Sequence, residues 1–122
     1  MKENNHVCSS VVVACIDYRF QDHIRKWIEE NISGGYDYVG IAGSTKDLET
    51  IKNQVEISVR LHNIKNAFLI HHENCGAYGD ESTPEKHTED LKKAKEEINK
   101  IHPKLRVNLY YLHLNGDFEN VG

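Results

Sequence analysis

Short apolar runs alternate with segments of helical periodicity along the whole chain. The runs are rich in β-branched residues and predict strands at 10–16, 36–43, 66–72 and 105–114. Between them, apolar residues recur at the three- and four-residue spacing of amphipathic helices. This order predicts an α/β fold: a three-layer sandwich around a mostly parallel four-stranded sheet with right-handed crossovers.

Each predicted helix carries one apolar stripe, which is best explained as the side that faces the core. In chain order the stripes are Ile24, Trp27, Ile28 and Ile32; Leu48, Ile51, Val55 and Val59; and Leu91, Ala94, Ile98 and Ile101. Gly34 or Gly35 is expected to end the first helix in a left-handed conformation. Ser44 or Thr45 is expected to cap the second helix, and Thr83 the third.

Length and composition limit the class of protein. The chain has 122 residues, which predicts one domain over 1–122. Hydrophobic residues make up 39% and charged residues 28%, as in globular proteins, and the net charge of −4 argues against a nucleic-acid partner. No apolar run reaches the ~18 residues of a membrane helix, and the start lacks a signal-peptide core. We therefore expect a cytoplasmic protein with no membrane partner, whose cysteines are thiols or metal ligands.

Cysteine and histidine stand where the first and third predicted strands end. Cys15 ends the first strand, while His72 and Cys75 follow the third, with Gly76 expected to allow a tight turn. Ligands of open parallel sheets bind beyond the carboxyl ends of strands, so these groups meet if the two strands are neighbours. Two thiolates and an imidazole suit Zn²⁺, and a fourth position stays open for water. Each cysteine alone could also be an apolar filler, and His71 competes with His72 but points to the opposite face.

Asp17 and Arg19 lie just past the first strand and two residues apart. In extended backbone their side chains project to the same side. One interpretation is a surface ion pair of little consequence. The other is that Arg19 holds Asp17 ionised, so that the carboxylate accepts a hydrogen bond from zinc-bound water.

Together these residues make the chain resemble the β-class carbonic anhydrases. The family pattern C-x-D-x-R matches "CIDYR" at 15–19, and H-x-x-C-G matches "HENCG" at 72–76. Between the two motifs, Ala42 and Gly43 agree with the family. The tail, 115–122, is similar to the strand that follows the fourth strand in the family. The resemblance covers nearly the whole chain.

The resemblance implies a fold, a metal site and an activity. The implied sheet has the order 2-1-3-4, with a possible extra C-terminal strand. Zn²⁺ is bound by Cys15, His72 and Cys75, with Asp17 and Arg19 as the catalytic pair and no other cofactor. The implied reaction is reversible hydration of carbon dioxide to bicarbonate by zinc-bound hydroxide, in a homodimer or higher homo-oligomer. In some family members the aspartate itself binds the zinc.

The chain also departs from the family. Tyr18 replaces a serine, Gly40 and Ile41 replace an arginine and an asparagine, and the chain is shorter than most members. Related proteins hydrolyse carbon disulfide or carbonyl sulfide, which keeps these substrates open. A non-catalytic zinc-binding relative is a third hypothesis. A weaker one takes "GIAGST" at 40–45 as an anion cradle at a helix start.

Some residues have less definite expectations. Leu109 to Leu114, with Phe118, are expected either in the core or in a subunit contact. Cys8 is expected to be a thiol without a role. The conceivable proton carriers are His23, His62 and His71.

Overall fold

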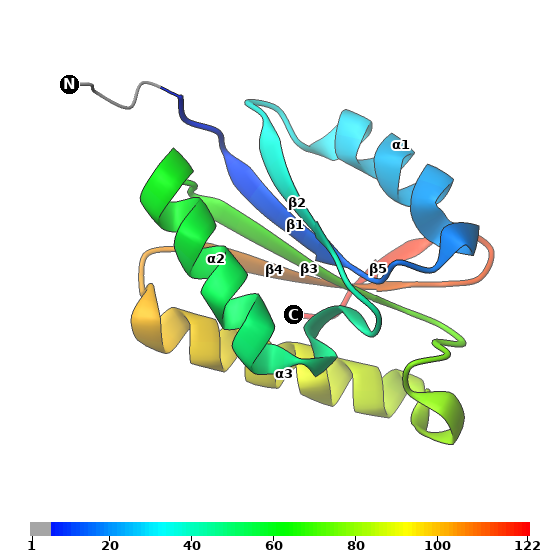
Figure 1. Cartoon of the computed structure of the whole chain (residues 1–122). Helices are drawn as coiled ribbons and strands as arrows, with labels where there is room; N and C mark the ends of the chain where they lie inside the picture. The colour runs from blue at the N-terminus through cyan, green and yellow to red at the C-terminus, as the bar shows by residue number, and fades with distance from the viewer. Residues whose placement is uncertain (1–5) are drawn as a thin grey trace.

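Five strands form one sheet in the order β2-β1-β3-β4-β5 (Figure 1). The structure is a computed structural model and describes residues 6–122. The strands are β1 Ser10–Ala14, β2 Tyr36–Gly40, β3 Asn66–His72, β4 Arg106–Leu112 and β5 Phe118–Asn120. The helices are α1 Gln21–Asn31, α2 Leu48–His62 and α3 Pro84–Ile101, and the short 3₁₀ turns are η1 Tyr18–Phe20, η2 Ser44–Lys46 and η3 Gly79–Glu81. All neighbouring strands are parallel except β4 and β5, so the predicted order 2-1-3-4 and the extra C-terminal strand are confirmed.

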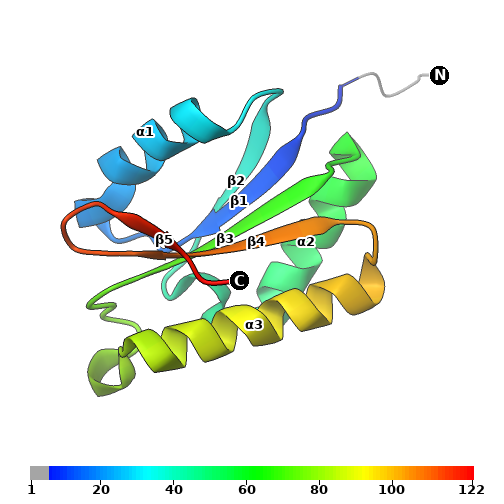
Figure 2. The ribbon, with the colours of Figure 1, turned by 180° about the vertical axis from the view of Figure 1, so that it is seen from behind.

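The sheet lies between two helical layers. Helix α1 covers one face, and α2 and α3 cover the other (Figure 2). The residues of β1 are fully buried and alternate: Val11 and Val13 belong to the core under α2 and α3, while Val12 and Ala14 belong to the core under α1. This alternation explains the unbroken apolar run, because a central parallel strand is buried on both faces. The three-layer prediction is therefore confirmed.

One prediction of a helix end is wrong, and so is one residue of a predicted core stripe. Helix α1 ends at Asn31 with Ile32 extended, and Gly34 and Gly35 lie beyond it with positive φ, where their carbonyls accept the Ser9 N–H. These glycines shape the entry to β2 instead of capping the helix. At the far end of α3, Ile101 is 53% exposed and so does not continue the core stripe.

The cap of α2 also differs from the prediction. Ser44 and Thr45 are buried in η2, and the Asp47 side chain accepts the first hydrogen bond of α2 from the Thr50 N–H. The prediction for α3 is confirmed, since Thr83 accepts from the Lys86 N–H. No helix within residues 6–122 is long and apolar enough to span a bilayer.

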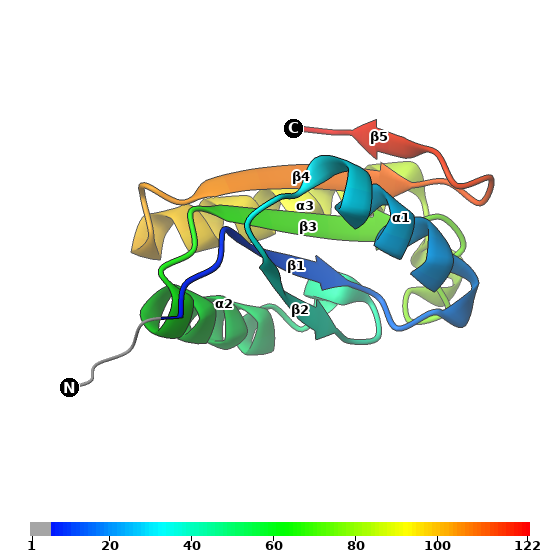
Figure 3. The same cartoon turned by 90° about the horizontal axis from the view of Figure 1, so that it is seen from above.

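Strand order is what positions the site. Strand β1 lies between β2 and β3, as the view from above shows (Figure 3). Its register pairs Val13 with Leu69. The chain therefore leaves the carboxyl end of β1, at Cys15, close to the last residue of β3, His72. These are the two strand ends on which the sequence places its cysteines and histidines.

Candidate metal centre

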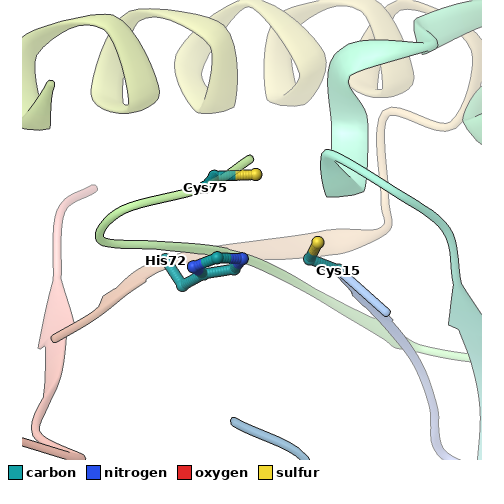
Figure 4. A group of neighbouring side chains, drawn as sticks. All are labelled: Cys15, His72 and Cys75. Atoms are coloured by element: carbon teal, nitrogen blue, oxygen red, sulfur yellow. The ribbon is translucent and has the colours of Figure 1, made fainter. Parts of the chain in front are cut away.

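Cys15, His72 and Cys75 meet at the carboxyl ends of β1 and β3. Their ligand atoms all lie within 4.8 Å of one another. The three side chains are turned toward a common space (Figure 4), and each residue is buried, with at most 7% of its surface exposed. The structure thus brings together the three residues that the sequence nominates, and it places His72 in this group instead of His71.

The His72 ring has one nitrogen suited to a metal. Its Nδ1–H donates to the Glu73 carbonyl at 2.7 Å, and the ring packs against Phe20. Its Nε2 is buried and has no hydrogen-bond partner among residues 6–122. Because the proton is on Nδ1, the Nε2 lone pair faces the group, which is how metal-binding histidines are oriented.

The two sulfurs form a pair that favours one thiolate. The pKa of Cys15 lies well below its ordinary value, chiefly because the Cys75 thiol donates a hydrogen bond to it; burial opposes this and the Gly43 N–H adds to it. The same hydrogen bond, together with burial, raises the pKa of Cys75. The thiolate is the form that binds metal, and a divalent cation would release the remaining proton. The donor set therefore fits zinc.

Gly43 brings its N–H to the Cys15 sulfur, at 3.4 Å. Its φ is +83°, and a Cβ there would lie 3.0 Å from the Cβ of Lys46 and 3.2 Å from that of Ala77. Only glycine fits this position without strain. The neighbouring Thr45 N–H points to the His71 ring at 3.4 Å. These two N–H groups already donate hydrogen bonds to the protein's own side chains and are not free to bind an anion, so the anion-cradle hypothesis for 40–45 is wrong.

Asp17 and Arg19 form the predicted pair, beside the metal group. Arg19 donates to the Asp17 carboxylate through its backbone N–H, Nε and a terminal nitrogen, the last at 2.7 Å. These hydrogen bonds lower the pKa of Asp17 to about 2. The carboxylate oxygen Oδ2 lies 3.8 Å from His72 Nε2. The ionised carboxylate is therefore held beside Cys15, His72 and Cys75, with Asp17 as the cap of η1 and Tyr18–Phe20 in a 3₁₀ turn instead of extended backbone.

Asn74 is a site residue that the sequence analysis missed. Arg19 donates to its side-chain oxygen at 3.0 Å and to its carbonyl at 2.9 Å, which ties the end of β1 to the turn after β3. Asn74 has φ +60°, whereas Gly76 has no positive φ and a Cβ on it would meet nothing within 4 Å. The expected tight turn is thus at Asn74, not Gly76. Asparagine tolerates the left-handed region, which is the signal that could have found it.

Gln21 is a second missed residue. Its amide nitrogen donates to the carbonyls of Cys15 and Asp17, at 2.9 and 2.8 Å. The first residue of α1 therefore fixes the loop that carries one metal ligand and the carboxylate. No sequence pattern distinguishes this glutamine from the polar residues of a helix start.

A buried network of hydrogen-bonded side chains on the opposite face of β3 supports Cys75. Thr45 Oγ1 lies 2.7 Å from His71 Nε2, and the two Nδ1 atoms of His71 and His87 lie 2.8 Å apart. His87 Nε2 lies 2.9 Å from Ser82 Oγ, which accepts the Cys75 N–H. Burial lowers the pKa of both histidines, to about 3 and about 4, so both rings are neutral. This network of side chains connects η2 and α3 to the backbone of Cys75.

Substituting His87 should destabilise the fold. His87 is fully buried, so His87→Ala removes the partner of His71 Nδ1 and one of the two partners of Ser82 Oγ, and it opens a cavity. We expect a loss of about 2–4 kcal/mol in the free energy of unfolding. Urea denaturation followed by circular dichroism measures it. Glu89→Ala, at an exposed position of the same helix, is the control and should stay within about 0.5 kcal/mol of wild type. Equal stability of the two variants would contradict a structural role for this hydrogen-bonded network.

Two of the conceivable proton carriers do not face the metal group. His71 is 1% exposed and packs on the α3 side of β3. His62, the last residue of α2, pairs with Asp37 at the opposite end of the sheet. The role of His23 as a proton carrier stays a prediction.

An open hollow of about 710 Å³ adjoins the metal group. Its walls include both cysteines, Asp17, Ile16 and Tyr18. Tyr18 is 86% exposed and Ile16 61%. The tyrosine that replaces the family's serine therefore stands at the rim of the hollow and leaves the metal group accessible.

The fold is that of the β-class carbonic anhydrases. The carbonic anhydrase of Streptococcus mutans superposes with a TM-score of 0.69 and 14% identity over 100% of this chain and 86% of that chain. The β-carbonic anhydrase isoform I of Trichomonas vaginalis gives 0.70 and 16%, over 99% and 87%. One of two carbonic anhydrases of Sordaria macrospora that are described as tetrameric gives 0.61 and 16%, over 97% and 82%.

The sequence itself matches a family model. The model of the family described as "Putative carbonic anhydrase" matches residues 5–122, so the chain belongs to this family. Two uncharacterized rickettsial proteins are similar along most of their length. The one from Rickettsia conorii is 30% identical over 93% of this chain and 72% of its own, and the one from Rickettsia bellii is 29% identical over 93% and 81%.

Proposed function

We propose that this protein is a zinc enzyme that hydrates carbon dioxide reversibly to bicarbonate. Cys15, His72 and Cys75 would hold the ion. The observation that carries the proposal is the buried Nε2 of His72, which has no hydrogen-bond partner within the described part of the chain and faces two sulfurs beside an ionised carboxylate. Membership of the "Putative carbonic anhydrase" family supports the same activity.

The chain's own residues have distinct roles in this proposal. Zinc, when bound, acts as a Lewis acid that makes water a nucleophile near neutral pH. Asp17 accepts a hydrogen bond from the water and orients it, which an ionised carboxylate held by Arg19 can do over the whole neutral range. Arg19 is fixed in turn by Asn74. The ordered loop therefore keeps Asp17 paired with Arg19 and away from binding the ion itself.

Carbon dioxide suits the surroundings of the group. The hollow contains Ile16, Ala42 and Ala77, whose small or apolar side chains offer an uncharged, linear molecule a path to the metal group. No buried cation is needed to bind such a substrate. Bicarbonate, the anionic product, would leave through the open side of the hollow.

Stopped-flow hydration of carbon dioxide by the zinc-loaded protein tests the proposed activity. We expect rate acceleration that disappears after chelation and returns with Zn²⁺. A parallel assay measures sulfide released from carbon disulfide and carbonyl sulfide. Sulfide release without carbon dioxide hydration would assign the site to those substrates, and bound zinc without either activity would contradict an enzymatic role.

Apolar side chains around the hollow support a homo-oligomer. Ile16 and Tyr18 are exposed, and β2 is an edge strand whose Tyr36 and Tyr38 are each 42% exposed. An isologous contact over this surface would cover the edge of β2 and close the hollow. Of the two expectations for the segment 109–114, the core applies to Leu109 and Leu112, which are fully buried within the subunit. We propose a homodimer or higher assembly in the cytoplasm, without nucleic-acid or membrane partners.

Sedimentation equilibrium at micromolar concentration should give at least a dimer of the 14.0 kDa chain. Ile16→Glu should shift the protein toward the monomer, because two like charges would be buried in the contact. Ile101→Glu is the matched control, since this isoleucine is also about half exposed but lies at the end of α3. A monomeric wild type that still hydrated carbon dioxide would contradict both the assembly and the shared hollow.

A further inference from the structure

A second group of metal-binding residue types lies at the opposite end of the sheet. Cys8 precedes β1, Asp37 is in β2, and His62 ends α2. Their ligand atoms lie within 4.8 Å of one another, as in the first group, and all three residues are half-buried. The end of α2 lies beside the start of β1 (Figure 3), and the Cys8 N–H donates to the His62 carbonyl at 3.2 Å.

Helix α2 orients the carboxylate of this group. Ser58 and His62 are four residues apart and therefore on one face of the helix. Ser58 donates to Asp37 Oδ2 at 2.6 Å, and His62 Nδ1 lies 2.8 Å from the same oxygen. Burial raises the pKa of Asp37, but these hydrogen bonds outweigh it and the net pKa is lowered. Ser58 and His62 thus hold the carboxylate in one orientation.

Asp37 and His62 could form an ordinary hydrogen-bonded pair without a cysteine beside them, so the position of Cys8 is what points to a metal site. The Cys8 thiol donates to the Ser10 carbonyl at 3.6 Å, a weak local contact, and hydrogen bonding from Cys8 also contributes to the lowered pKa of Asp37. The thiol nevertheless lies beside the carboxylate and the imidazole, and the His6 ring packs 4.9 Å from the His62 ring. Sulfur, oxygen and nitrogen donors together suit Zn²⁺ or Co²⁺. Tetrahedral zinc ligands lie roughly 3.3–3.8 Å apart, so small side-chain rotations would bring Cys8, Asp37 and His62 to ligand distance. His6 lies outside this group of three, and its ring would have to turn toward them.

We propose that Cys8, Asp37 and His62 form a second metal site, which takes Zn²⁺ and has His6 as its fourth ligand. Four protein ligands leave no open position, so the ion has a structural role. It joins the segment before β1 to the edge strand β2 and to the end of α2. Strand β2 pairs with β1 alone, so it gains a second attachment where the sheet begins.

Cobalt isolates this site spectroscopically. In the full-length Cys15→Ser/Cys75→Ser variant only Cys8 can give thiolate-to-cobalt charge-transfer absorption. Titration of that variant with Co²⁺ alone should produce the band with one equivalent bound. Adding Cys8→Ser should abolish the band, and adding His62→Gln should weaken binding at least about tenfold. Adding His23→Gln, which changes a histidine outside the group, should leave it unchanged.

Zinc counting in the intact protein is an independent measurement, which holds even if the double variant folds poorly. Wild type should carry two zinc ions per chain after removal of excess metal, and Cys8→Ser should carry one. A wild type with one zinc that Cys8→Ser retains would overturn the proposal. So would a cobalt band in the double variant that survives removal of Cys8. Neither result depends on whether the first site catalyses a reaction.

Discussion

Cys75→Ser is expected to lose the zinc of the first site and, with it, all hydration activity. Serine keeps the size of the side chain but replaces a thiolate with a hydroxyl, which is a poor zinc ligand. Substitution of supporting residues around metal ligands costs about 10–100-fold in affinity, so loss of a ligand should cost more than about 100-fold. His72 Nε2 would then be left as a buried nitrogen with no hydrogen-bond partner from residues 6–122.

Metal analysis after dialysis against a chelator measures this loss. Both proteins are compared in the Cys8→Ser background, so that any second zinc does not contribute. We expect about one zinc per chain without the Cys75 substitution and close to none with it. Tyr18→Ser is the control, because it changes the rim of the hollow without removing a donor. Full zinc retention by the Cys75 variant would remove that residue from the site.

Asp17→Asn is expected to keep its zinc and to lose most of its hydration activity. The amide has nearly the same shape, but it carries no charge and presents a donor where the carboxylate presents two acceptors. The ion pair with Arg19, now 2.7 Å long, would be lost as well. Positioned proton acceptors contribute about 10²–10⁴-fold, so we expect kcat/KM for carbon dioxide to fall by about 100-fold or more.

Stopped-flow kinetics and metal analysis on the same preparation separate chemistry from binding. Asp22→Asn is the matched control: this aspartate also pairs with an arginine, Arg25, but its side chain is 84% exposed on α1. Its rate should equal that of wild type. Equal rates for Asp17→Asn and wild type would show that the pair has no catalytic role, whereas loss of zinc would assign Asp17 a part in holding the metal.

Much of the fold follows from local sequence patterns. A strand that is buried on both faces must be apolar throughout, so Ser10–Ala14 is recognisable without knowing its neighbours. The helices are recognisable because each must bury one stripe. The errors fall at helix ends, where Asp47 caps α2 instead of Ser44 or Thr45. Several residues near each end could serve as caps, and the path of the connecting loop selects one.

The meeting of Cys15, His72 and Cys75 was predictable for a different reason. Cys15, His72 and Cys75 each follow a predicted strand, and parallel strands all end at the same edge of their sheet. Position on the strand could not rank His71 against His72, because both lie on one strand and face opposite sides; only the family motif favoured His72. The structure decides this by burying His71 with Thr45 and His87 and by directing His72 to the sulfurs.

The sequence by itself determined which segments become strands and helices and which strand ends carry metal-binding groups. Only the tertiary structure decided which distant side chains meet. Asn74 joins Arg19 across 55 positions, and Asp37 joins His62 across 25, through strand pairings that no local window contains. Burial imposes a repeating pattern that can be recognised within one segment. A contact between segments depends on sheet order and register, which the packing of the whole chain fixes.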